Sequence, residues 1–206
     1  MDQVLTLVCK LQPTPEQAQK LSQTVVAFAD ACNWVNQHTD PTLTNRVALQ
    51  TLVYKDIRAH FGLSANLAVR VCARVSANRK VAKQKKRSVK GFAPTSADYD
   101  ARIFSFREKD WTVSLRTVDG RERMPIQIGN YQRGKLAGQQ PTSAQLCLHR
   151  DGQFYLHIQI DTPCPEPPKG TDKVIGVDFG RREIARTSTG KGWSCLLYTS
   201  DAADDT

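Results

Sequence analysis

The chain has 206 residues, of which 29 are Lys or Arg and 20 are Asp or Glu, so the formal net charge is +9 at pH 7. This length is enough for one or two folded domains, and 40% hydrophobic residues exclude a wholly disordered chain. No stretch approaches the roughly 20 apolar residues of a membrane helix, and the N-terminus lacks the basic region of a secretory signal. We therefore expect a basic intracellular protein whose partner is a polyanion.

The cysteines carry no metal-finger pattern. They stand at positions 9, 32, 72, 147, 164 and 195, and no two of them form a Cys-x-x-Cys pair. We expect each to be a reduced, small, buried hydrophobic residue.

The first part of the chain predicts one strand and then three helices. Residues 3–11 alternate as a strand does. Thr14-Pro15-Glu16-Gln17 is a capping-box start for a helix that would run to about residue 37. A second helix is expected from about 44 to Gly62. A third, capped by Ser64, carries Leu67, Val71 and Val75 one turn apart.

After Phe92 the apolar period changes to that of strands. Strands are predicted at 102–106, 111–117, 124–128, 144–149 and 154–160. Asp151-Gly152 is a strong hairpin-turn signal between the last two. This pattern predicts an antiparallel sheet or small barrel, which the first strand joins, so that the helices are an insertion. The proline-rich residues 162–170 then predict a linker.

Positive charge is concentrated in one part of the chain. Between Asp56 and Asp98 there is no acidic residue but there are ten basic ones. A solvated helix face is the ordinary reading of such a run. We favour binding to a phosphate backbone, because ordinary surfaces mix both signs; a nuclear-import signal in KQKKR fits less well. The candidate nucleic-acid-binding residues are Arg70, Arg74, Arg79, Lys80, Lys83, Lys85, Lys86, Arg87 and Lys90.

Two other patterns carry less weight. The run from Gly129 to Lys135 resembles a phosphate-binding loop, but Leu136 stands where Ser or Thr is needed and LAGQQP is a poor helix, so this reading is rejected. The histidines show no ligand spacing. His149 and His157 flank a predicted turn and are read as ordinary strand residues.

Asp178 is the candidate metal ligand. It lies near the end of the apolar strand VIGVDFG, which a return strand, EIARTST, follows. A carboxylate on a rigid hairpin suits Mg²⁺, which takes oxygen ligands from several segments. The alternative is a turn aspartate that caps a strand. Asp172 and Glu183 lie nearby in sequence, but strand geometry gives no reason to aim all three at one ion.

The ordered set of motifs resembles a known family. KLQPTPEQAQKL, NWVNQ, the basic helix, YDARIFSF and DGRERMPIQIGNYQ are followed by the AQL…YLHIQI hairpin and VIGVDFGRREIARTSTG. Together they look like the N-terminal half of a TnpB-type protein, also called OrfB transposase, a relative of compact type V CRISPR effectors. The resemblance covers roughly residues 1–193.

The resemblance implies an RNA-guided DNA endonuclease with a RuvC-like, RNase H-type nuclease domain. The processes it implies are transposition and DNA recombination. The helices, also labelled helix-turn-helix, and the barrel would bind guide RNA and target DNA. Asp178 matches the first catalytic carboxylate, a ligand of the catalytic Mg²⁺ ions. The implied location is the cytoplasm of a prokaryote, associated with the nucleoid, with no membrane partner and no small-molecule substrate.

The expected fold class is therefore α+β, with a helical bundle inserted in a wedge-like antiparallel β-barrel, followed by the first hairpin of a RuvC domain. The expected domains are a barrel from 1–13 and 92–161, a basic helical recognition domain at 14–91, a linker at 162–171, the start of the nuclease domain at 172–194, and a non-native tail at 195–206.

The chain departs from the family pattern at its end. The family's later Glu, its further Asp and its Cys-x-x-Cys zinc ribbon all lie downstream of the GVDFG hairpin, and this chain stops before them. Its last twelve residues, CLLYTSDAADDT, resemble the translated end of a sequencing adapter. Without them 29 basic residues face 17 acidic ones, a net charge of +12. We expect a gene fragment, genuine to about Ser194, that cannot cleave DNA alone.

Two other hypotheses stay open. The chain could be a stand-alone nucleic-acid-binding module without catalysis. Alternatively, residues 172–206 would be disordered or prone to aggregate, because a lone hairpin leaves its strand edges unpaired.

Overall fold

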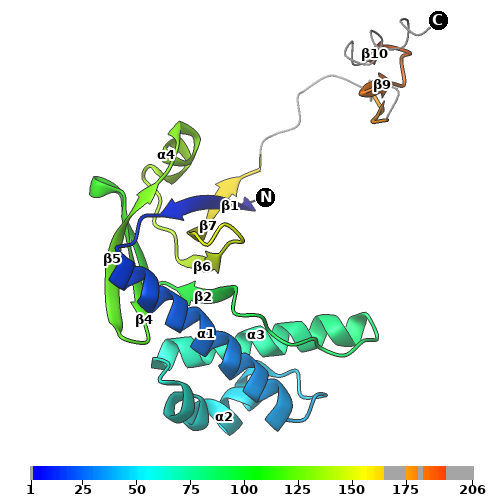
Figure 1. Ribbon diagram of the computed structural model, residues 1–206. Coiled ribbons are helices and arrows are strands. Elements are labelled where there is room, and N and C mark those ends of the chain that lie inside the picture. Colours follow the sequence, from blue (N-terminus) through cyan, green and yellow to red (C-terminus); the bar gives the residue numbers. More distant parts are fainter. Residues whose placement is uncertain (1, 165–174, 181–182, 194–206) are drawn as a thin grey trace, which may run out of the picture. The chain divides into compact units, whose positions relative to one another are not determined.

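The computed structural model describes residues 2–164, 175–180 and 183–193 (Figure 1). The chain divides into two compact units, Met1–Pro163 and Cys164–Thr206, and this boundary falls within the predicted linker at 162–171. The first unit is α+β, with helices and a nearly closed, barrel-like antiparallel sheet, as the sequence predicts. Within the described ranges, no helix combines the length and apolar character needed to cross a membrane.

The sheet of the first unit has seven strands. They are β1 (Asp2–Leu11), β2 (Ser96–Asp100), β3 (Phe104–Arg107), β4 (Thr112–Thr117), β5 (Gly120–Gln127), β6 (Ser143–Leu148) and β7 (Phe154–Pro163). Their order is β2-β6-β7-β1-β5-β4-β3. β1 pairs with β7 along nearly its whole length and with β5 at its end, so the prediction that the first strand joins the sheet is confirmed.

One hydrogen bond links β2, at one end of the strand order, to β4, which lies next to the other end. The buried Tyr99 hydroxyl donates to the Arg116 carbonyl at 3.0 Å, while the Arg116 amide donates at 2.9 Å to the carbonyl of Ile103, the residue just before β3. Burial raises the pKa of Tyr99. Inside the barrel, alternate side chains are buried, as in β7, where Phe154, Leu156, Ile158 and Ile160 face the interior.

Three helices stand between β1 and β2 in the sequence: α1 (Pro15–His38), α2 (Arg46–Phe61) and α3 (Ala65–Gln84). The capping box predicted for α1 is present, with the Gln17 amide donating to Thr14 Oγ1 and the Thr14 amide donating to Gln17 Oε1. Gly62 ends α2 at φ +62, a conformation in which glycine has no steric penalty. The predicted cap at Ser64 is wrong in one respect, because its hydroxyl makes no cap hydrogen bond and is buried without a partner.

Two of the inserted helices, α1 and α3, pack against β2, and α2 packs against both of these helices (Figure 1). Their apolar stripes supply buried residues to one continuous core with the barrel, among them Leu21, Val25 and Phe28 of α1 and Leu67, Val71 and Val75 of α3. Full burial of such a side chain contributes about 1.5–3 kcal/mol. Helices and barrel therefore form one folded unit.

Several elements differ from the sequence prediction. The strand expected at 102–106 begins at Phe104, because Asp100 forms a turn in which its carbonyl accepts from Ile103 and its carboxylate from Arg102, both at 3.0 Å. β5 begins earlier than predicted, at Gly120. β2, the short helix α4 (Asn130–Leu136) and the 3-10 turn η1 (Glu108–Asp110) were not predicted.

In the second unit the described residues form three very short antiparallel strands. They are β8 (Val177–Asp178), β9 (Ala185–Thr187) and β10 (Gly192–Trp193), in the order β10-β9-β8. β8 and β9 pair as a strand and its return. The assignment of this hairpin to a RuvC domain stays a prediction, and the expected tail at 195–206 lies outside the described residues.

The cysteines follow their prediction in part. Cys9, Cys32, Cys72 and Cys147 are buried and unpaired, and burial raises the pKa of Cys9 and of Cys72 to about 11. Protonated, buried thiols are poor nucleophiles, so these residues serve in packing. Cys164 is exposed, contrary to the prediction. Cys195 is not among the described residues.

Candidate nucleic-acid interface

Six exposed cations gather where α3 ends. We call them the α3 basic surface: Lys80, Lys83, Lys85, Lys86, Arg87 and Lys90. The first two lie on the last turns of the helix, and the others follow it directly. A helix C-terminus carries partial negative charge, which favours cations there. The same cations remain free to meet an external anion, because the ion pairs found in the described part of the chain use other residues.

The end of α3 has a defined backbone geometry. Lys86 adopts the left-handed conformation at φ 49, and its amide donates to the Lys83 carbonyl at 3.2 Å. The Arg87 amide donates to the Ala82 carbonyl at 3.0 Å. These two bonds form a Schellman motif, in which glycine is the usual left-handed residue. The turn fixes the direction in which the cations after the helix leave it.

A hollow lies beside this surface. Its volume is about 360 Å³, and the loop between α1 and α2 and the last turns of α3 line it. The exposed Lys83 and Arg87 belong to its lining, as do Thr42 and Ser88, which carry hydroxyl groups. Two cations beside hydroxyl groups suit a phosphate group, which accepts hydrogen bonds from both.

Arg79 does not lie on the α3 basic surface, although the sequence placed it among the phosphate-binding candidates. Its side chain is 2% exposed. Its guanidinium donates to the carbonyls of Asp40 at 2.7 Å, Leu43 at 3.1 Å and Thr39 at 3.3 Å. Arg79 therefore fastens the end of α1 and the following loop to α3. The apolar seam of α3 could have shown this, because position 79 lies one turn after Val75.

Arg70 and Arg74 also bind within the protein. Arg70 pairs with Asp100 at 2.9 Å, and Arg74 with Asp98 at 2.6 Å, so both attach α3 to β2. The Arg74 guanidinium lies 5.2 Å from the centre of the Phe28 ring. Burial lowers the pKa of Arg74, but the hydrogen bonds and charge of Asp98 outweigh this and raise it. Phosphate binding by these two arginines would compete with the pairs that hold the helix.

Asp178 lies exposed on β8, opposite Arg186 of β9. The Glu183 carboxylate approaches Arg186 at 3.6 Å. Among residues 2–164, 175–180 and 183–193, no three His, Cys, Asp or Glu side chains gather as metal ligands. Asp172 lies outside the described residues. Asp178 alone does not make a magnesium site, and the Mg²⁺ assignment stays a prediction.

A histidine pair was missed by sequence reasoning. The Nε2 atoms of His149 and His157 lie 3.3 Å apart, and His157 Nδ1 lies 3.7 Å from the Cys147 sulfur. Burial, and then the nearby His149, lower the pKa of His157. The pair forms because the Asp151-Gly152 turn, with Gly152 at φ 75, brings β6 and β7 together in the predicted hairpin. The register of the hairpin was the signal that could have found it.

The residues that resemble a phosphate-binding loop have another structure. Residues 130–136 form α4, with Gly129 as its N-cap, and the chain leaves the helix at Ala137. The helical course of this segment differs from the open loop that wraps a phosphate.

Comparison with known proteins does not identify this interface. No protein-family model matches the chain, and no curated protein matches it.

Proposed function

We propose that this chain binds nucleic acid through the α3 basic surface, as the N-terminal part of a TnpB-like RNA-guided endonuclease. The observation that carries the proposal is the set of six exposed cations at the end of α3, within a stretch from 57 to 97 that has no acidic residue. On an ordinary protein surface, neighbouring acidic residues would neutralise part of this positive charge. Its partners in this proposal are guide RNA and target DNA, and their phosphates are the groups it contacts.

The salt dependence of binding tests this surface. Fluorescence anisotropy with a labelled RNA and with duplex DNA gives the slope of log affinity against log salt concentration. Replacement of Lys83, Lys85, Lys86 and Arg87 by Ala should weaken binding and flatten the slope, by about 0.9 for each residue that met a phosphate of the duplex. The matched control replaces Lys55, Arg58, Lys109 and Arg123, exposed residues elsewhere with the same total charge. Equal effects of the two variants would contradict the proposed surface.

The parent reaction in this proposal is Mg²⁺-dependent hydrolysis of DNA phosphodiesters, with Asp178 as one of the metal ligands. Two-metal hydrolysis needs several carboxylates to hold the ions. We therefore expect no cleavage by this chain. Purified chain, guide RNA, matched target DNA and Mg²⁺ are incubated together, and a specific cut would overturn this expectation.

A second candidate is a nucleic-acid-binding module that works without catalysis. It is favoured by the first unit, Met1–Pro163, which holds the basic surface together with a continuous core of its own. Competition separates the two candidates. Any unlabelled RNA of the same length would displace labelled guide RNA equally well from a general binding module. A TnpB-like protein would retain its own guide in the presence of unrelated RNAs.

A further inference from the structure

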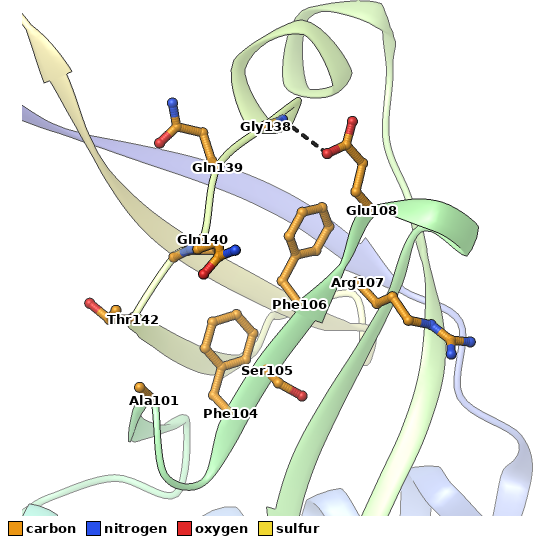
Figure 2. A pocket seen from close by; sticks show the side chains of 11 residues that line it. Ala101, Phe104, Ser105, Phe106, Arg107, Glu108, Gly138, Gln139, Gln140 and Thr142 are labelled. Carbon is orange, nitrogen blue, oxygen red and sulfur yellow. Dashed lines mark hydrogen bonds between the residues drawn. The ribbon is translucent and has the colours of Figure 1, made fainter.

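A cleft of about 450 Å³ opens in the wall of the barrel, between β3 and residues 138–142 (Figure 2). This volume is within the range of sites that take small organic ligands. The phenyl rings of Phe104 and Phe106 point from β3 toward the segment that carries Gln139 and Gln140, whereas Ser105 and Arg107 point the other way. The cleft thus has an aromatic wall on one side and the Gln140 amide on the other.

The aromatic wall is held in place. Phe104 is fully buried and belongs to the core, while Phe106 is half-buried and lines the cleft. The Phe106 ring lies 5.9 Å from that of Trp111, and the Arg133 guanidinium lies 5.2 Å from the Trp111 ring. A ring fixed by its neighbours loses little conformational entropy when a planar ligand stacks on it.

The backbone of β3 adds hydrogen-bonding groups. Arg116 donates to the Ile103 carbonyl, and the antiparallel register places Ser105 opposite Ser114 and Arg107 opposite Thr112 as the next bonded pairs. The amides and carbonyls of Phe104 and Phe106 therefore point away from β4. Because β3 ends the strand order, these groups face the cleft and can bind the polar edge of a ligand.

The cleft is short. At one end the Gly138 amide donates to the Glu108 carboxylate at 2.9 Å, and at the other Ala101 lies in the turn that connects β2 to β3. An added peptide strand would have to continue past both ends of β3. The arrangement favours a compact, flat ligand over an extended chain.

We propose that this cleft receives one unpaired nucleobase of a single-stranded segment. The base would stack on Phe106, and its polar edge would meet the β3 backbone and the Gln140 amide. Aromatic stacking with hydrogen bonds to a base edge is the usual chemistry by which proteins bind splayed-out bases. The assignment rests on the proposed function, which brings a nucleic acid to the protein, and it names a second, base-dependent contact distinct from the α3 basic surface.

Binding of two twelve-nucleotide single strands to the full chain tests the proposal. One is oligothymidylate, and the other has the same backbone with abasic sites throughout. Phe106→Leu keeps an apolar side chain but removes the ring, and we expect it to weaken oligothymidylate binding roughly 5- to 150-fold. Binding of the abasic strand should stay unchanged. Phe61→Leu, which alters another half-buried phenylalanine on α2, is the matched control and should change neither.

The other outcomes are decisive as well. An equal effect of Phe106→Leu on both strands, or no effect on either, overturns the nucleobase site while the proposed function stands. If neither strand binds while labelled RNA and duplex DNA do, the nucleobase site is overturned and the proposed function stands. If none of these nucleic acids shows salt-dependent binding, the proposed function fails and the site with it. Displacement of oligothymidylate by an excess of an extended Thr-Val hexapeptide would identify a strand-binding edge and overturn the assignment. If Phe106→Leu does not fold, the exposed Gln140→Ala takes its place and should alter the relative affinity for the four homopolymers.

Discussion

Arg74 of α3 and Asp98 of β2 form an ion pair with two hydrogen bonds, from Nε to Oδ2 and from Nη2 to Oδ1, each 2.6 Å long. The same arginine donates to Ser96 at 3.1 Å, and Gln145 of β6 donates to Asp98 at 3.0 Å. The pair therefore joins the inserted helices to two neighbouring strands of the barrel. Two-bond pairs between a guanidinium and a carboxylate are among the stronger polar contacts in proteins.

The first prediction concerns this pair. Asp98→Ala should lower the free energy of unfolding by about 2–3 kcal/mol, because the partly buried Arg74 loses its charged partner. Urea denaturation monitored by circular dichroism gives this value. Arg107→Ala is the control, since Arg107 forms an exposed pair with Asp110 and its loss should cost at most about 1 kcal/mol. Equal losses in the two variants would show that the Arg74–Asp98 pair contributes no more than a surface pair.

The second prediction concerns Arg79. Arg79→Met keeps a flexible, unbranched side chain but leaves the carbonyls at the end of α1 without their donors. We expect a loss of about 3 kcal/mol or more in the free energy of unfolding, because several buried acceptors lose their partners together. Lys80→Met, on the next and exposed position of the same helix, should change stability by less than about 0.5 kcal/mol. A stable Arg79→Met variant would contradict the structural role.

The third prediction concerns the left-handed residue after α3. Lys86→Gly should raise the free energy of unfolding by about 0.5–1 kcal/mol, because glycine avoids the steric cost of φ 49 but has more freedom to lose on folding. Lys85 has φ −87, so Lys85→Gly removes the same charge but relieves no steric cost, and it should lower the free energy of unfolding. Thermal unfolding of both variants provides the comparison. Equal effects would mean that charge, and not backbone conformation, decides the result.

The fourth prediction concerns pH. His157 faces His149 and Cys147, and Arg70 and Asp98 lie in the same polar hollow. Its pKa is lowered in the folded protein, so the unfolded chain binds a proton at a higher pH than the folded protein does. The contribution to stability is full above about pH 6.5 and is lost as the pH falls from there through the folded pKa, by less than about 1.4 kcal/mol per pH unit.

Urea denaturation at pH 7.5, 6.5 and 5.5 measures this dependence. His157→Gln removes the titrating group while keeping a polar side chain, so its stability should fall less than that of the wild type over this interval. Parallel curves for the two proteins would contradict the prediction.

The elements with a local signal could be predicted from the sequence. The capping box at Thr14 and the Asp151-Gly152 turn follow from neighbouring residues, and both form as predicted. β2 has no such signal, because the aspartates of SADYD disfavour a strand. Arg70 and Arg74, which lie more than twenty residues away in the sequence, pair with those aspartates. Such a non-local contact cannot be read from a short window of sequence.

The nucleic-acid interface was only partly predicted, because some of its candidate residues have partners that are distant in the sequence. The cations after residue 79 are exposed, as a local run of charge indicates. The three arginines before them were grouped with the run by charge alone, but their partners come from β2 and from the end of α1. The cleft beside β3 depends on which strand ends the sheet, and this strand order is a property of the whole tertiary fold.

The pairing of β1 with β7 also has a consequence for biosynthesis. Leu5 lies opposite Ile160, so β1 leaves the ribosome about 150 residues before its partner strand β7. At about 5–20 residues per second, β1 waits for roughly 8–30 seconds. During this time α1, α2 and α3 can already pack with one another, because their contacts are closer in sequence. Emergence of β7, and not helix formation, therefore sets the moment at which the barrel closes.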